Sequence, residues 1–132
     1  MAALETGDAG VESGEAAIEA AREAGLVHIE ILAMNRLAEL ALTADRLHEA
    51  DVQSATAAQM LRRHGNIQGP EEVVFFTRAR VLQALGRDDE AERPLSEARA
   101  AVELKASCIA DGDARSRFLA LAPNPAILGD DE

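Results

Sequence analysis

The stretches Thr43-Ala-Asp-Arg-Leu-His-Glu-Ala50 and Ala84-Leu-Gly-Arg-Asp-Asp-Glu-Ala91 share one pattern, and each separates two runs that are rich in Leu and Ala. The runs on either side repeat their apolar residues at the three- and four-residue spacing of an amphipathic helix. A turn that recurs after one helical hairpin is typical of a chain built from stacked helix pairs. Such chains act by offering a surface, so we expect the function to be binding.

The composition favours an all-α fold. Hydrophobic residues make up 48% of the 132 residues, yet aromatic residues make up only 2%. Alanine is abundant; it favours helix more than any other residue, and its small side chain lets helix axes come close together. A β-sandwich would need more β-branched and aromatic residues. At this length we expect one domain with a core shared between several helices.

Apolar periodicity and helix breakers give the expected elements. We predict helices over residues 13–24, 27–44, 47–64, 71–85 and 88–108, and a short last helix that begins near residue 113. Asp45, Asp88 and Asp113 are expected to cap the helices that follow them. Pro94 should bend its helix or delay its start, because proline removes one backbone hydrogen bond.

These elements predict three parts of the chain. Residues 1–12 are expected to form a flexible amino-terminal leader, because they show little periodicity. Residues 13–122 form the helical domain. Residues 123–132 are expected to be an irregular tail, because Pro123 and Pro125 end regular structure.

Charge and cysteine content limit the partners and the compartment. The formal net charge is −11, and nucleic acids and anionic membranes bind cationic faces, so we expect neither as a partner. Solubility explains the acidity, and a basic peptide partner is the alternative. The single cysteine, Cys108, fits a reducing compartment. No signal peptide is apparent and no apolar run approaches the ~18 residues of a membrane helix, so we expect a cytoplasmic protein.

The two stretches resemble the tetratricopeptide repeat (TPR), a helix–turn–helix unit of about 34 residues. With the turns superposed, small and apolar residues fall on the packing positions of that family: Met34, Leu37, Ala38, Ala41, Leu47, Ala50, Ser54 and Ala57, then Phe75, Ala79, Leu82, Gly86, Ala91, Leu95 and Ala98. Residues 13–25 supply an earlier half unit. The chain departs from the family in its spacing, since Ala50 and Ala91 are 41 residues apart.

The resemblance implies a right-handed α-α superhelix of about two and a half TPR-like hairpins, closed by a short carboxyl-terminal capping helix. The stretch from Gln68 to Pro123 also resembles the closing segment of helical-repeat regions in large bacterial signalling and transcription-regulating ATPases. That second resemblance implies either a free-standing relative or the carboxyl-terminal piece of such a regulator.

The sequence shows no motif for catalysis, a cofactor or a metal. His28, His48 and His64 lie on different predicted segments, and none has a Cys or carboxylate at metal-ligand spacing. Cys108 on a helical face is typical of a small apolar residue. No phosphate-binding loop, nucleophile elbow or HExxH motif occurs. We therefore expect neither an enzyme nor a cofactor-binding protein; an enzyme or small-ligand binder would need a deep polar pocket around a His or Cys108.

The TPR resemblance also implies that the first helix of each hairpin lines a concave groove. The residues at its inward positions, called here the predicted groove, are Leu32, Asn35, Glu39, Leu42, Val73, Phe76, Arg80 and Gln83. Its apolar members would make contact with a peptide or helix, and its polar members would orient it. Phe75 and Phe76 point about 100° apart on a helix, so one can belong to the core while the other is more exposed. Burial of both is the alternative.

We therefore expect a non-catalytic module that binds a peptide or a partner helix in this groove. Glu39 argues against the clamp for carboxyl-terminal tails found in chaperone-binding TPR proteins. The alternative is a self-association or regulatory element of a larger signalling ATPase, in which the amino-terminal half unit pairs with a second copy as a homodimer. An uncapped end of a helical stack exposes apolar surface of the kind that symmetric dimers bury.

Overall fold

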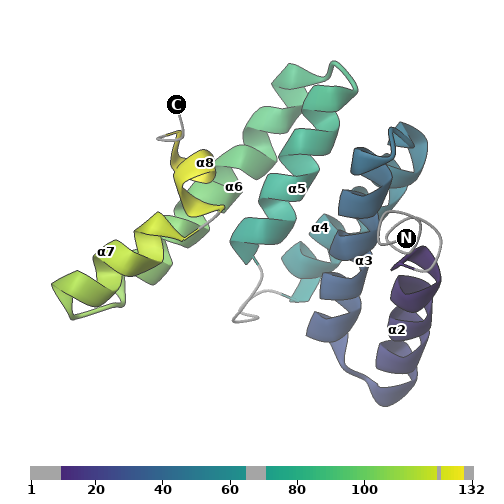
Figure 1. The fold of residues 1–132 in the computed structure, drawn as a ribbon, viewed down its shortest axis with the longest axis horizontal. Helices are drawn as coiled ribbons and strands as arrows, with labels where there is room; N and C mark the ends of the chain where they lie inside the picture. Colours follow the sequence, from purple (N-terminus) through teal and green to yellow (C-terminus); the bar gives the residue numbers. More distant parts are fainter. Residues whose placement is uncertain (1–9, 65–70, 122, 130–132) are drawn as a thin grey trace.

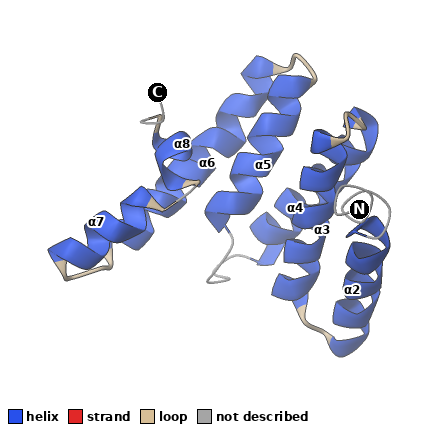
Figure 2. Ribbon diagram, viewed as in Figure 1, coloured by secondary structure: helices blue, strands red, loops and turns tan. Residues whose placement is uncertain are grey.

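A computed structural model of the chain describes residues 10–64, 71–121 and 123–129, and all regular structure in these ranges is helical (Figure 1, Figure 2). The helices are α2 (Gly10–Ala24), α3 (Val27–Thr43), α4 (Leu47–His64), α5 (Glu71–Ala84), α6 (Asp88–Ser107), α7 (Gly112–Ala120) and α8 (Asn124–Leu128). The expected all-α class is confirmed for the described residues.

The helices from α3 to α6 begin where the sequence predicts and end within one residue of the predicted positions. Helix α6 begins at Asp88 with Pro94 inside it, so the proline does not delay its start. Helix α2 begins at Gly10, three residues earlier than expected, so the last part of the predicted leader is helical. Glu12 in the first turn suits the positive end of the helix dipole and favours this earlier start. Residues 1–9 lie outside the described residues.

Three turns share one backbone geometry. Each contains a residue in the left-handed region: Gly25 (φ 72°), Asp45 (φ 61°) and Gly86 (φ 77°). The next residue then donates its N–H to the carbonyl five positions back, with N···O distances of 2.8 Å for Leu26 to Ala21, Arg46 to Ala41 and Arg87 to Leu82. This is the long hydrogen bond of the Schellman motif. The similar stretches 43–50 and 84–91 therefore fold into the same turn.

This turn overturns the predicted helix caps. Asp45 lies in the left-handed region, one position too early to cap α4, and Asp tolerates that region better than most residues. Asp88 is already the first residue of α6. Asp111, not Asp113, caps α7, since its Oδ2 accepts the N–H of Ala114 at 3.0 Å. The first two caps are wrong by one residue because the turn determines where α4 and α6 begin. The third is wrong by two residues because the side chain of Asp111 caps α7.

Successive helices pack against each other from α2 to α6, and α3 also contacts α5 (Figure 1). Fully buried alanines let the helices of each hairpin come close: Ala50 packs with Ala41 and Val81, and Ala91 packs with Ala79. Helix α2 uses a glycine for the same purpose. A Cβ at Gly14 would lie 2.6 Å from Leu37 Cδ2, so any other residue here would require the Leu37 side chain or α2 to shift.

The main hydrophobic cluster extends from α2 to α8. Its larger members come from six helices and include Ile18, Ile31, Met34, Leu37, Leu61, Val74, Phe75, Val102 and Ile127. Phe75 is 7% exposed, whereas Phe76 is only partly buried and packs against the edge of the cluster. The prediction of one core phenylalanine with a more exposed neighbour is therefore confirmed.

The carboxyl-terminal segment corrects the predicted irregular tail. Residues Asn124–Leu128 form α8, and its Ile127 is fully buried. Pro125 is compatible with this helix because the first turn needs no backbone N–H donor. Arg99 Nε donates to the Ile127 carbonyl at 2.9 Å and ties α8 to α6. The expected capping helix near residue 113 is α7, which contributes only partly buried side chains; α8 supplies the buried residue at this end of the stack.

Candidate functional site

On α3, the four residues of the predicted groove differ widely in exposure. Leu32 is 43% exposed, whereas Asn35 is only 3% exposed. Glu39 is partly exposed and lies 3.8 Å from Arg36, its partner in a surface ion pair. Leu42 is half-buried and packs against the cluster around Ala50. This row therefore combines one accessible apolar side chain with one buried amide.

On α5, the row is more accessible. Val73 and Phe76 are half-buried, and Arg80 and Gln83 are exposed. The Arg80 guanidinium lies over the Phe76 ring, 5.9 Å from its centroid, a geometry that attracts a cation to the π face. Because α3 and α5 are in contact, the two rows belong to neighbouring helices.

Asn35 has an unusual environment. Its Oδ1 atom is buried and accepts no hydrogen bond within the described residues. Buried polar atoms nearly always have a partner, and an unpaired one costs about 1–3 kcal/mol. With only 3% of its surface exposed, Asn35 lies within the helix packing and is not accessible to a partner in this conformation.

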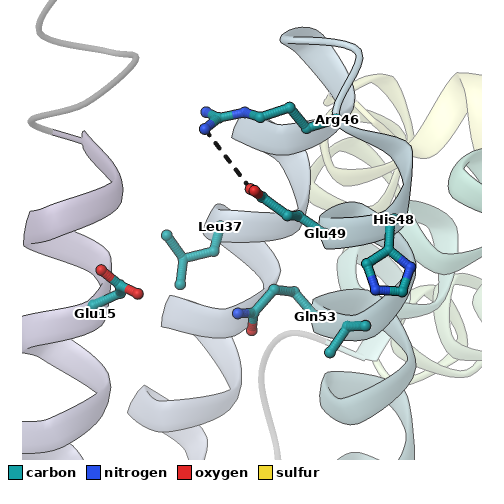
Figure 3. A pocket seen from close by; sticks show the side chains of 7 residues that line it. Glu15, Leu37, Arg46, His48, Glu49 and Gln53 are labelled. Atoms are coloured by element: carbon teal, nitrogen blue, oxygen red, sulfur yellow. Dashed lines mark ion pairs between the residues drawn. The ribbon is translucent and has the colours of Figure 1, made fainter.

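A first cleft lies between α2 and α4, with α3 as its floor, and is called here the α2–α4 cleft. It has a volume of about 340 Å³ and is lined by Glu15, Leu37, Arg46, His48, Glu49, Val52 and Gln53. Figure 3 shows Glu15 on α2, across from Leu37, Glu49 and Gln53. Glu49 approaches Arg46 at 3.7 Å, and both side chains are more than a third exposed.

A second cleft, the α4–α6 cleft, lies over α5 and has a volume of about 320 Å³. Its lining residues are Arg62, Arg78, Leu82, Asp89, Glu90, Arg93 and Pro94. The 41-residue spacing of the two turns relates the clefts: it carries Leu37, His48, Glu49, Val52 and Gln53 onto Arg78, Asp89, Glu90, Arg93 and Pro94. The two clefts therefore occupy equivalent places in successive hairpins.

Arginines tie the α4–α6 cleft together. Arg62 makes a bidentate pair with Glu97 of α6, with distances of 2.9 Å from Nε and 2.6 Å from the terminal nitrogen. This hydrogen bond raises the pKa of the Arg62 guanidinium above its ordinary value, against an opposing effect of burial. Arg78 of α5 reaches α4, where it donates to Asp51 Oδ1 at 2.7 Å and to Ser54 Oγ at 3.0 Å.

Sequence reasoning missed both clefts. The spacing between Ala50 and Ala91 contained the necessary signal, because it matches the lining residues of one cleft to those of the other. When this spacing is compared only for the faces that pack between helices or line the predicted groove, the lining residues of the clefts are left out. The long-range pairs could not be found in this way, since Arg62 and Glu97 are 35 residues apart.

No model of a known protein family matches the chain, and no curated protein or solved structure is significantly similar to it. In the part of the chain that the structure describes, no three His, Cys, Asp or Glu side chains gather where they could hold a metal ion. No helix in those ranges has the length and apolar character needed to cross a membrane. The function is therefore argued from the geometry of the predicted groove and the two clefts.

Proposed function

We propose that this chain is a non-catalytic interaction module that binds a peptide or a partner helix in the predicted groove on α3 and α5. The hairpins would stack as a right-handed, TPR-like superhelix. The module would serve in the cytoplasm of a bacterial cell as part of a regulatory protein. The proposal is supported by the recurring Schellman turn and by the contact between the two helices that carry the groove.

The observation that carries the proposal is the set of accessible side chains on the two contacting helices α3 and α5. On α3, Leu32 offers 43% of its surface for apolar contact. Asn35 is only 3% exposed, so in this conformation it does not take part in the contact. On α5, Phe76 and the Arg80 guanidinium above its ring offer an apolar face and a positive charge.

The groove is tested by Phe76→Ala and Arg80→Glu in a display screen for peptide binders. We expect peptides selected on the natural protein to bind each variant at least about tenfold more weakly, because both changes remove groove contacts. The matched control is Arg117→Glu, which makes the same charge change on exposed α7. Circular dichroism must show that each variant stays folded. Equal binding by the natural protein and both groove variants contradicts the proposal.

Self-association is the alternative function, and one specific observation favours it. Leu26, Ile29 and Leu32 are 42%, 39% and 43% exposed at the start of α3. Their three-residue spacing places them along one side of the helix, and an apolar patch of this kind is often buried in a symmetric dimer. Sedimentation at micromolar concentration separates the two functions, since only self-association predicts a dimer that Ile29→Glu disrupts.

A further inference from the structure

The α2–α4 cleft is separate from the predicted groove. Its floor residue Leu37 and the groove residue Leu32 point about 140° apart around α3, because successive residues of an α-helix are rotated by about 100°. A partner in the groove therefore does not fill the cleft. Binding in the α2–α4 cleft is therefore independent of the function proposed for the groove.

The equivalent cleft shows how such a space is filled. Three guanidinium groups, those of Arg62, Arg78 and Arg93, line the α4–α6 cleft. In the α2–α4 cleft the equivalents of Arg78 and Arg93 are Leu37 and Val52. The 41-residue spacing places Ala21 at the position of Arg62, and α2 lines the cleft with Glu15 instead. The first cleft thus lacks these three arginines, keeps Arg46 as its lining arginine and has a carboxylate on its α2 side.

The carboxylates of the α2–α4 cleft lack strong partners. Within residues 10–64, 71–121 and 123–129, no cation lies within ion-pair distance of Glu15, and Glu49 has only the 3.7 Å contact with Arg46. All 13 Lys and Arg residues of the chain fall in those ranges. No side chain elsewhere in the chain can therefore supply the missing positive charge.

The other lining residues suit an arginine side chain. Arginine packs its methylene stem on apolar surface while its planar guanidinium binds carboxylates in a bidentate fashion. Leu37 and the half-exposed Val52 provide apolar surface, and the amide of Gln53 provides a hydrogen-bonding group beside it. Arg46 lies at one end of the cleft, where it contacts Glu49. Glu15 lies on the opposite side of the cleft from Glu49 (Figure 3).

We propose that the α2–α4 cleft binds an arginine side chain presented by a segment of a partner protein. Its guanidinium would pair with Glu15 and Glu49, and its stem would lie against Leu37 and Val52. The net charge of −11 favours the approach of such a basic segment. Bound in this way, the partner would join α2 to α4 as Arg62 joins α4 to α6.

The experiment uses a capped twelve-residue peptide with three arginines on an alanine background, titrated into the ¹⁵N-labelled full chain. The control peptide carries citrulline, whose neutral urea group has nearly the same shape as the guanidinium. We expect the arginine peptide to shift the amide resonances of Glu15, Val52 and Gln53. We expect the citrulline peptide to bind at least about fivefold more weakly, because charge-assisted pairs are about twice as strong as neutral ones.

Two variants test the location of the site. Glu15→Gln should weaken binding of the arginine peptide by about fivefold, whereas Glu23→Gln should change it less than about twofold, since Glu23 lies about 12 Å further along α2. Val52→Arg, which places the equivalent of Arg93 in the cleft, should also weaken binding by about fivefold. Its control is Ser116→Arg, the same charge change on exposed α7.

Three results would overturn the proposal. The first is equal binding of the arginine and citrulline peptides. The second is an equal loss of affinity in Glu15→Gln and Glu23→Gln, which would mean that the overall charge attracts the peptide. The third is a set of shifted resonances confined to α3 and α5, which would place the peptide in the predicted groove and leave the cleft without a ligand.

Discussion

The two clefts occupy equivalent places between successive hairpins, yet only one of them is closed by the chain itself. In the α4–α6 cleft, Arg62 and Arg78 bridge neighbouring helices through carboxylates. In the α2–α4 cleft, Leu37 and Val52 stand at the equivalent positions of arginines, and Glu15 has no partner among the described residues. The difference shows that one backbone arrangement can hold either a cleft bridged by arginines or an unbridged cleft, and that a few side chains decide which.

The largest effect should come from exchanging the floor residue of the open cleft. Leu37→Arg introduces the equivalent of Arg78, but Leu37 is only 4% exposed and packs beside Gly14 of α2. Glu15 lines the same cleft and can pair with the new charge, but the longer side chain overpacks the contact between Leu37 and α2. We expect a loss of about 3 kcal/mol in the free energy of unfolding, measured by urea denaturation, because overpacking a core position costs about 1–3 kcal/mol and burial of the charge adds to it.

Leu37→Met is the matched control for that variant, since it keeps the volume and the apolar character and should cost less than about 1.5 kcal/mol. If Leu37→Arg proves no less stable than Leu37→Met, the floor of the open cleft is not packed as described, and the comparison between the clefts fails.

A smaller effect should come from cutting the tether of the closed cleft. Arg62→Ala removes the bidentate pair with Glu97 and the stacking of the guanidinium 5.3 Å from the Phe75 ring. We expect a loss of about 2 kcal/mol, because Arg62 and Glu97 are both mostly buried and hydrogen bonds to charged groups contribute about 1.5–3 kcal/mol. The measurement is again urea denaturation.

Glu15→Ala provides the contrast in the open cleft. It removes an exposed side chain without a partner in the described residues, so the free energy of unfolding should stay within about 0.5 kcal/mol. Similar losses in Arg62→Ala and Glu15→Ala would show that the tether contributes no more than an ordinary surface residue.

The smallest effect should come from Arg78→Leu, which gives the closed cleft the floor residue of the open one. Asp51 keeps its 3.9 Å contact with Arg87, and Ser54 keeps its hydrogen bond to the Asp51 carbonyl. Because both partners retain an interaction and leucine replaces the apolar stem, we expect a loss of about 1 kcal/mol. Thermal denaturation checks it; a loss above that of Arg62→Ala would reverse the order of the two tethers.

The helices were predictable because their boundaries depend on local information. Apolar spacing and breakers such as Gly86 gave the helices from α3 to α6 to within one residue of their ends. The turn residues were not predicted correctly, because Asp45 can either cap a helix or adopt the left-handed conformation. Helix α8 was missed because Pro125 indicates an end of structure unless Ile127 has a core to enter.

The site was less predictable than the helices. Superposing the two turns placed the predicted groove on α3 and α5, which do contact each other, but exposure could not be read from spacing. Asn35 is almost fully buried, whereas Phe76 at the equivalent position of α5 is only half-buried. The clefts depend on how hairpins stack and on pairs such as Arg62 with Glu97, which are 35 residues apart. Local periodicity contains no information about such pairs.

Gly14 gives the open cleft a property that its lining residues do not reveal. The bare backbone at this position lets α2 lie directly on Leu37, whose side chain would otherwise meet a Cβ at 2.6 Å. A larger residue here requires either a rearrangement of the Leu37 side chain or an outward shift of α2 together with the neighbouring Glu15. Either response changes the shape of the α2–α4 cleft, because both Leu37 and Glu15 line it. A position that is not itself a lining residue thus controls the dimensions of the opening.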